Sequence, residues 1–195
     1  MTPLLLVALL ALVSQPLTGQ GEKIQTDTSS SGQLLAEHFF FGADAPRRIY
    51  VRATAGKGQL VLLTEYPRNG TVLFSPDDKW IALNDNLGSD MAEVRLFKRD
   101  RGLRFREVLN ADISGKAWAF LARTYRRHQP VHLDHMYVNV VHWADDSRAL
   151  LLLLWGHTDS DNYVEPWYCV YHIPGKRVGI SLAPLNRGAV KLSGR

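Results

Sequence analysis

Cysteine is almost absent from this chain of 195 residues, which contains Cys169 and no other. No disulfide can form within the chain, so the fold must be held together by its apolar core. Cys169 lies in the run WYCVY, residues 167–171, and this setting favours a buried side chain over a reactive thiol. The length suits one domain with a core of its own.

Apolar runs long enough to cross a bilayer as a helix, which needs about 20 residues, are also missing. Residues 4–13 form an apolar run of 10, followed by polar and helix-breaking residues, with Gly19 and Gly21 in the −3 and −1 places of a cleavage site. This pattern predicts a signal peptide over residues 1–21, and a buried N-terminal helix is the alternative. No cysteine lies directly after this apolar run, where it could carry a lipid anchor. We therefore expect a secreted or periplasmic product without an integral membrane segment.

The signatures of several enzyme classes are missing too. The sequence contains no GxSxG nucleophile elbow and no HExxH zinc motif. The short glycine-rich stretch at residues 56–58 is not followed by the helix that a phosphate site would need. We therefore expect no catalytic residue and no cofactor.

Neither sign of charge dominates, because 23 Lys and Arg oppose 19 Asp and Glu for a net charge of +4. Basic residues gather locally, over residues 95–106 and 123–127. We interpret the first group as the solvated outer face of two strands rather than as an anion-binding site. We accordingly expect no nucleic-acid partner.

Short apolar segments separated by Gly, Pro and Asn fill most of the chain, which is typical of antiparallel β architecture. The expected strands are 38–41, 48–53, 59–64, 71–75, 79–84, 92–98, 104–109, 136–143, 149–155, 166–173 and 177–181. Residues 149–155 are apolar at every position, which predicts a central strand covered on both faces. Residues 22–33 are polar and rich in Ser and Thr, which predicts a flexible leader.

Over residues 114–127 the spacing of apolar residues changes from that of a strand to that of a helix. Ala117, Trp118, Leu121 and Tyr125 fall near one helical face, so we predict one amphipathic helix there. We assign it to an insertion over residues 112–128 of a single all-β domain, residues 34–195.

One turn pattern occurs twice, 69 residues apart, as FSPDDK at residues 74–79 and WADDSR at residues 143–148. Each copy joins two apolar runs through proline or aspartate residues that favour a tight turn, which predicts an antiparallel hairpin. The predicted turn residues are Ser75, Pro76, Asp77, Asp78, Asp145, Asp146 and Ser147. Because paired carboxylates recur in both copies, we interpret them as turn formers rather than catalytic acids.

These hairpins resemble the blade hairpins of WD-type and Tol-type β-propellers, in which an aromatic-Ser-Pro-Asp-Gly/Ser-Lys/Arg turn joins the second and third strands of a blade. Propellers of prolyl-oligopeptidase-type peptidases carry similar turns. The second copy lacks the proline, and the first has Asp78 where Gly or Ser is usual. Closed propellers use about four or more blades, so the resemblance implies an open or sandwich-like meander with about three blades' worth of strands. It also implies protein or peptide partners.

The densest polar cluster is HQPVHLDH, residues 128–135, and a further histidine lies on the next expected strand. Imidazole and carboxylate ligands suit zinc, and the candidate ligands are His132, Asp134, His135 and His142. We favour a solvated connector here, with a small exported hydrolase, zinc-dependent or not, as the alternative.

The favoured function is an exported, non-catalytic binding or scaffold module for protein or peptide partners. We expect a monomer, because like-charged arginine strands would oppose edge-to-edge pairing of two chains.

Overall fold

The computed structural model describes residues 21–55, 58–126, 133–159 and 162–192. These residues form thirteen strands and one helix, which confirms the predicted mainly-β class. The strands are β1 (Glu22–Thr28), β2 (Leu34–Phe40), β3 (Arg47–Ala53), β4 (Val61–Tyr66), β5 (Asn69–Phe74), β6 (Trp80–Asn86), β7 (Met91–Arg101), β8 (Arg104–Glu107), β9 (His135–Trp143), β10 (Ala149–Asp159), β11 (Asn162–His172), β12 (Arg177–Ser181) and β13 (Val190–Lys191). The helix is α1 (Ile113–Thr124).

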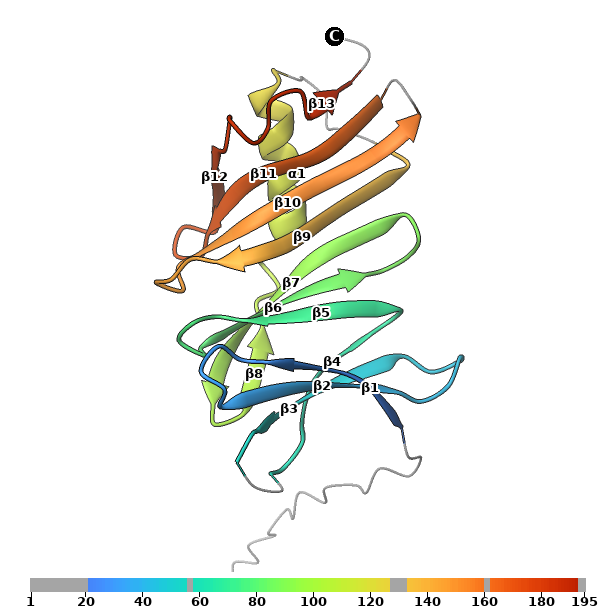
Figure 1. Cartoon of the computed structure of the whole chain (residues 1–195), viewed down its shortest axis with the longest axis vertical. Coiled ribbons are helices and arrows are strands. Elements are labelled where there is room, and N and C mark those ends of the chain that lie inside the picture. Colours follow the sequence, from blue (N-terminus) through green and yellow to red (C-terminus); the bar gives the residue numbers. More distant parts are fainter. Residues whose placement is uncertain (1–20, 56–57, 127–132, 160–161, 193–195) are drawn as a thin grey trace, which may run out of the picture.

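Consecutive strands pair antiparallel in three meanders of four strands, which we call meander 1 (β1–β4), meander 2 (β5–β8) and meander 3 (β9–β12). Meander 1 is a separate sheet. A short parallel contact between β7 and β9, at Met91 and Ala92, joins meanders 2 and 3 into a nine-stranded sheet that includes β13. Figure 1 shows the three meanders following one another along the long axis, from blue to red. The arrangement is open, as predicted.

Two apolar clusters hold the sheets together. The larger cluster lies between α1 and one face of the nine-stranded sheet and includes Leu121, Leu152 and Cys169. The smaller cluster joins meander 1 to meander 2 and includes Ile49 and Ile81. Cys169 is fully buried, as predicted, and burial raises the pKa of its thiol to about 12.

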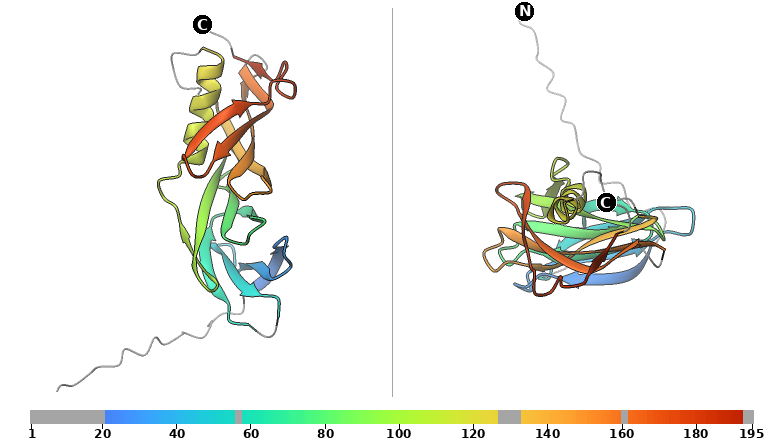
Figure 2. Two further views of the ribbon diagram at one scale, coloured as in Figure 1. Left: turned by 90° about the vertical axis from the view of Figure 1, so that its left-hand side faces the viewer. Right: turned by 90° about the horizontal axis from the view of Figure 1, so that it is seen from above.

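Helix α1 confirms the predicted amphipathic helix, with its end a few residues earlier than expected. Its buried residues recur at helical spacing and include Ile113, Ala117, Trp118 and Leu121. They pack on meander 3, so the helix covers one face of that meander (Figure 2).

The predicted flexible leader, residues 22–33, is wrong for its first part, because Glu22–Thr28 forms β1 and pairs with β2. The strand was missed because its polar composition is that of an exposed edge strand. Its order comes from distant contacts, such as the hydrogen bond of 3.0 Å that the Val72 amide donates to the carboxylate of Asp27. The predicted signal peptide lies outside the described residues except for Gly21. Among the described residues, no helix has the length and apolar character needed to cross a membrane.

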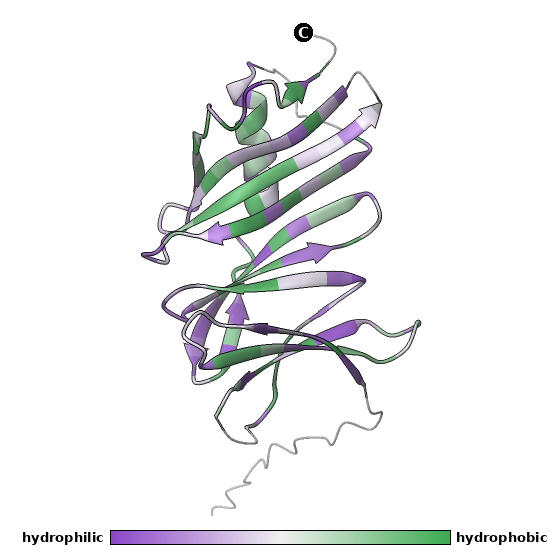
Figure 3. Ribbon diagram, viewed as in Figure 1, coloured by the Kyte–Doolittle hydropathy of each residue, from purple (hydrophilic) through white to green (hydrophobic). Residues whose placement is uncertain are grey.

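The prediction that residues 149–155 are covered on both faces is also wrong, because one face of β10 is open. The even-numbered leucines at 150, 152 and 154 have no exposed surface. The odd-numbered side chains point the other way: Leu151 and Leu153 are half-buried, and Trp155 is 37% exposed. Helix α1 covers the first face only, and no element lies in front of the second in Figure 1. In Figure 3 the first part of the β10 ribbon is green, because residues of both faces are apolar there.

Candidate interaction surface

The predicted turn residues form two turns of the same geometry. In the first, the Ser75 amide donates to the carbonyl oxygen of Trp80 at 2.9 Å, and in the second Ala144 donates to Ala149 at 2.9 Å. The fourth turn residue has positive φ in both, at 55° in Asp78 and 59° in Ser147. Both hairpins are therefore as expected, between β5 and β6 and between β9 and β10.

A third copy of this turn, which sequence reasoning missed, joins β1 to β2. The Ser29 amide donates to the carbonyl oxygen of Leu34 at 3.0 Å, and Gly32 has the positive φ of 70°. Its sequence, SSSGQ, starts 46 residues before Ser75, close to the length of about 40–45 residues for a propeller blade. Glycine at the position that needs positive φ, followed by apolar residues, was the signal available.

The three turns contact one another side by side. The Ser31 hydroxyl donates to the carboxylate of Asp78, and the Asp77 amide donates to the Ser147 hydroxyl at 3.1 Å. Inside the middle turn, Asp77 also accepts from the Ser75 hydroxyl at 2.7 Å. These side chains close the turns and join neighbouring meanders.

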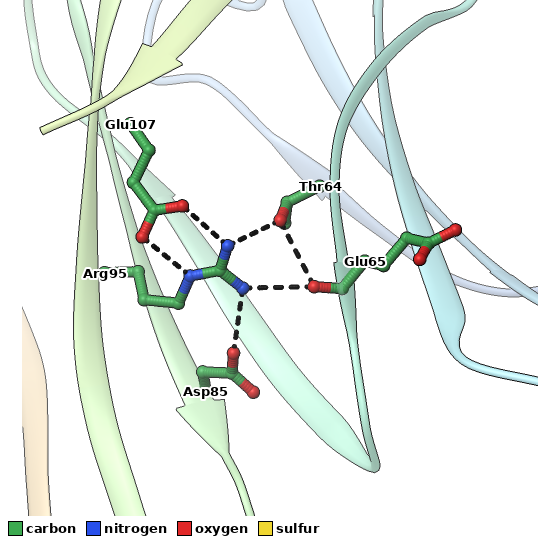
Figure 4. Close-up of polar contacts among 5 residues, drawn as sticks. All are labelled: Thr64, Glu65, Asp85, Arg95 and Glu107. Atoms are coloured by element: carbon green, nitrogen blue, oxygen red, sulfur yellow. Dashed lines mark hydrogen bonds and ion pairs between the residues drawn. The ribbon is translucent and has the colours of Figure 1, made fainter. Parts of the chain in front are cut away.

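A largely buried polar cluster centres on Arg95, which joins meander 1 to meander 2 (Figure 4). Its guanidinium donates to both carboxylate oxygens of Glu107 at 3.0 and 2.7 Å, to Asp85 at 3.1 Å, to the carbonyl of Glu65 at 3.0 Å and to the hydroxyl of Thr64 at 2.6 Å. An arginine has five N–H donors, and all are used here. No donor remains for a ligand, so the cluster is a joint between meanders.

Three carboxylates surround this single guanidinium. Asp85 is 1% exposed, and burial raises its pKa above the usual range, although hydrogen bonding to Arg95 opposes the rise. Glu93 lies directly opposite Asp85, and burial, followed by the charge of Asp85, raises its pKa as well. Raised carboxyl pKa values can mark a general acid. Asp85, however, is too buried to reach a substrate.

A second buried cluster, Asp27, His38 and Tyr66, has the residue types of a catalytic relay. The two ring nitrogens of His38 lie 2.8 Å from the Tyr66 hydroxyl and 2.8 Å from the Asp27 carboxylate. His38 has no exposed surface and Tyr66 is 3% exposed, while burial raises the pKa of Tyr66 to about 12. The same Asp27 oxygen accepts from the Val72 amide of β5. This cluster too is a joint between meanders 1 and 2.

The joint between meanders 2 and 3 uses an asparagine. The side chain of Asn84 accepts a hydrogen bond from the Val140 amide at 2.7 Å and donates to the Val140 carbonyl at 3.0 Å. The indole of Trp143 donates to the carbonyl of Leu73 at 3.1 Å. These side-chain bonds link β9 to β6 and to β5, neither of which is its neighbour in the strand order of the sheet.

Two of the predicted zinc candidates, His135 and His142, are not brought together. His132 lies outside the described residues. His135 and His142 occupy opposite ends of β9, about 23 Å apart at the rise of a strand. The Asp134 amide donates to the Thr158 hydroxyl at 3.1 Å. Within the described part of the chain, no group of three or more His, Cys, Asp or Glu residues could hold a metal ion.

The open face of meander 3 presents a surface that we call the outer patch. Its eight members share three properties: they are uncharged, they alternate with buried residues along β9, β10 or β11, and none is fully buried. The members are Tyr137, Asn139, Val141, Leu151, Leu153, Trp155, Tyr168 and Val170. Val141 is 41% exposed and Trp155 is 37% exposed.

Stacked rings fix one end of the outer patch. Trp155 and Tyr137 face each other across β9 and β10, with ring centroids 3.8 Å apart and planes at 12°. Beside them, His135 and His157 stack at 4.4 Å and 22°. The Tyr137 hydroxyl also donates to the carbonyl of Ser89 in the β6–β7 connection. These contacts hold the rings in one orientation.

No family model matches the chain, and no curated protein matches it. Among solved structures, the chain is similar to the crystal structure of TolB from Acinetobacter baumannii, with 11% identity and a TM-score of 0.43. The aligned region covers 80% of this chain and 31% of TolB, so this chain spans less than a third of that protein. A likeness at this level assigns no family, and the resemblance to propeller blades stays a prediction.

Proposed function

We propose that this chain is an exported, non-catalytic binding module that engages a protein partner through the outer patch. The observation that supports this function is an uncharged, half-exposed sheet face with a fixed aromatic stack at one end. Apolar surface with aromatic anchors is typical of protein interfaces. The polar side chains of the Arg95 and His38 clusters, in contrast, form hydrogen bonds that join meanders 1 and 2.

Export is part of the same proposal and rests on the apolar run at residues 4–13. Cleavage after Gly21 would leave a single domain that begins with β1. N-terminal sequencing of the protein from its natural host should start at Glu22. A mature protein that retains Met1 would contradict export.

Binding can be tested with a photoreactive amino acid at Leu153, in the centre of the outer patch. The matched control is Leu62, which is 49% exposed on β4 in meander 1. Irradiation of the exported chain in its host should give a discrete protein adduct from position 153 and none from position 62. Equal labelling at both positions, or no adduct at either, would argue against the outer patch as a binding surface.

A further inference from the structure

We infer that His135 and His157 form a two-histidine site for a divalent transition-metal ion. The site lies where β9 begins and β10 ends. The ion belongs to the class that prefers imidazole nitrogen, such as copper(II) or zinc(II). Neither histidine is a member of the outer patch, so the inference does not depend on the proposed function. The sequence predicted His135 as a zinc candidate but did not indicate His157 as its partner.

Strand pairing brings the two imidazole rings together. His157 lies directly opposite His135 in the antiparallel register of β9 and β10. Their rings stack with centroids 4.4 Å apart and planes at 22°. Two histidine nitrogens that bind one zinc ion, each at about 2.0–2.1 Å, lie about 3–4 Å from each other. A small rotation of the two side chains therefore brings one nitrogen of each ring to a shared ion.

Hydrogen bonds to Tyr137 decide which nitrogen of His135 is available. The Tyr137 hydroxyl has one proton, which it donates to the carbonyl oxygen of Ser89, a group that can only accept. The Nδ1 atom of His135, 3.2 Å from the same hydroxyl oxygen, is therefore the donor and carries the ring proton. Neutral His135 keeps its lone pair on Nε2. Histidines that bind metals commonly donate their other N–H in this way, which fixes the ring and its tautomer.

The surroundings of the histidine pair favour a cation. His157 is exposed and His135 is half-buried, so an ion from solution can reach the rings. Within five residues of either histidine, the sequence contains no Lys or Arg and three aspartates, Asp134, Asp159 and Asp161. Negative charge near a site raises the local concentration of cations.

Two protein ligands make an open site with exchangeable water rather than a closed structural one. Among the described residues, no third His, Cys, Asp or Glu completes the ligand set. Structural zinc sites use four protein ligands, so we expect a weaker dissociation constant, in the micromolar range. Copper(II) binds most tightly of the divalent first-row metals to a given set of nitrogen ligands. Copper(II) is therefore the probe of choice.

Isothermal titration calorimetry of the exported chain, made without a histidine tag, tests the inference with copper(II) alone. One ion should bind per chain, and electron paramagnetic resonance of the bound ion should show splitting from two nitrogen ligands. His157→Ala, which changes an exposed side chain, should weaken binding at least tenfold and leave a single nitrogen ligand. Tyr137→Phe keeps the ring but removes the acceptor of the Nδ1 proton, and it should weaken binding roughly tenfold.

The matched control is His142→Ala, which removes an exposed histidine at the other end of β9 and should bind copper(II) like the parent. A parent chain without saturable binding at about 100 µM copper(II) would overturn the site. Equal affinities of the parent and His157→Ala, or equal weakening by His142→Ala and His157→Ala, would show adventitious binding only. An unchanged affinity in Tyr137→Phe would contradict the tautomer assigned to His135. None of these results changes the adduct expected from position 153, so the binding module is tested separately.

Discussion

Replacing Arg95 by methionine should destabilise the fold much more than replacing an exposed arginine of meander 2. The substitution keeps an unbranched side chain but removes all the hydrogen bonds that Arg95 donates across the joint. Asp85, 1% exposed, would lose the only cation that it contacts at hydrogen-bond distance among the described residues. Its second carboxylate oxygen already lacks a hydrogen-bond partner there.

Removing one partner of a buried ion pair costs about 3–5 kcal/mol, since the other charge stays buried and uncompensated. The Arg95 side chain is 19% exposed and that of Glu107 is 29% exposed, so solvent reduces part of this cost. We expect a loss of about 3 kcal/mol, a large share of a total stability of about 5–15 kcal/mol.

Urea unfolding followed by circular dichroism at neutral pH measures this loss. The matched control is Arg106→Met, because Arg106 pairs with Asp100 at the surface, where the two side chains are 70% and 40% exposed. That control should lose less than about 1 kcal/mol. Equal losses in the two variants would refute the buried-joint interpretation.

The pH dependence gives an independent check. Burial raises the folded-state pKa of Asp85 above its usual 3.8, so ionisation of this group costs stability as the pH rises through that raised pKa. Arg95 opposes the rise, and its removal should raise the pKa further. The destabilisation by Arg95→Met should therefore be largest at neutral pH and shrink as the pH falls through the raised pKa. The double variant with Asp85→Asn should recover much of the loss at neutral pH.

The remaining predictions concern meander 3. Leu152→Asp should unfold the protein, because an unpaired carboxylate in the core costs several kcal/mol, roughly the whole stability. Leu153→Asp, at a half-buried position on the open face, should lower the melting temperature much less; similar unfolding of both variants would contradict the open outer face. Gly156→Ala should lower the melting temperature by several degrees, about 1–3 kcal/mol of overpacking, since a Cβ atom there would collide with the carbonyl oxygen of His135. A melting temperature equal to that of the parent would show that β9 and β10 are further apart at this point.

Local sequence signals predicted most of the fold. Apolar residues that alternate between turn-forming residues predicted eleven strands. Ten of them agree with strands of the structure to within a few residues at each end. The strand predicted at 177–181 matches β12 in full. The remaining one, 38–41, covers only the second half of β2. Helical spacing of Trp118 and Leu121 was enough to find α1. Patterns of this kind depend on the nearest neighbours in the chain, which is why they can be read from it.

Strand β1 could not be found in this way, because distant residues order it. Gln25 donates to the carbonyl of Gly70 at 3.2 Å, and Asp27 accepts from both His38 and Val72. Each partner lies 11 to 45 residues away. Polar composition alone predicts disorder for such a segment, and only its partners show otherwise.

The basic stripe over residues 95–106 was interpreted correctly only in part. Lys98, Arg104 and Arg106 are exposed, as expected for a solvated face. Arg95 belongs to the same run of charge but points inward, to partners that come from three other strands. Alternation along β7 would have separated Arg95 from Lys98, since residues an odd number of positions apart face opposite sides.

The joints between meanders share one solution to the problem of sheet edges. An edge strand has backbone N–H and C=O groups without a strand partner, and burial makes such groups costly. Asp27 accepts from the edge amide of Val72, while Asn84 pairs with both backbone groups of Val140. Asn186 does the same for Tyr168 at the end of the sheet, accepting at 2.7 Å and donating at 2.8 Å.

These polar residues also fix the register between meanders. Apolar contacts between sheets tolerate small shifts, whereas a side chain that bonds both backbone groups of one residue fits at a single position. The three aligned turns add a second constraint at one edge of the stack, through Asp77 and Ser147. The cores therefore stabilise the stack, and the polar joints decide how its layers align. From their residue types alone these polar residues would be predicted to lie at the surface, because the sequence does not show which backbone groups they bind.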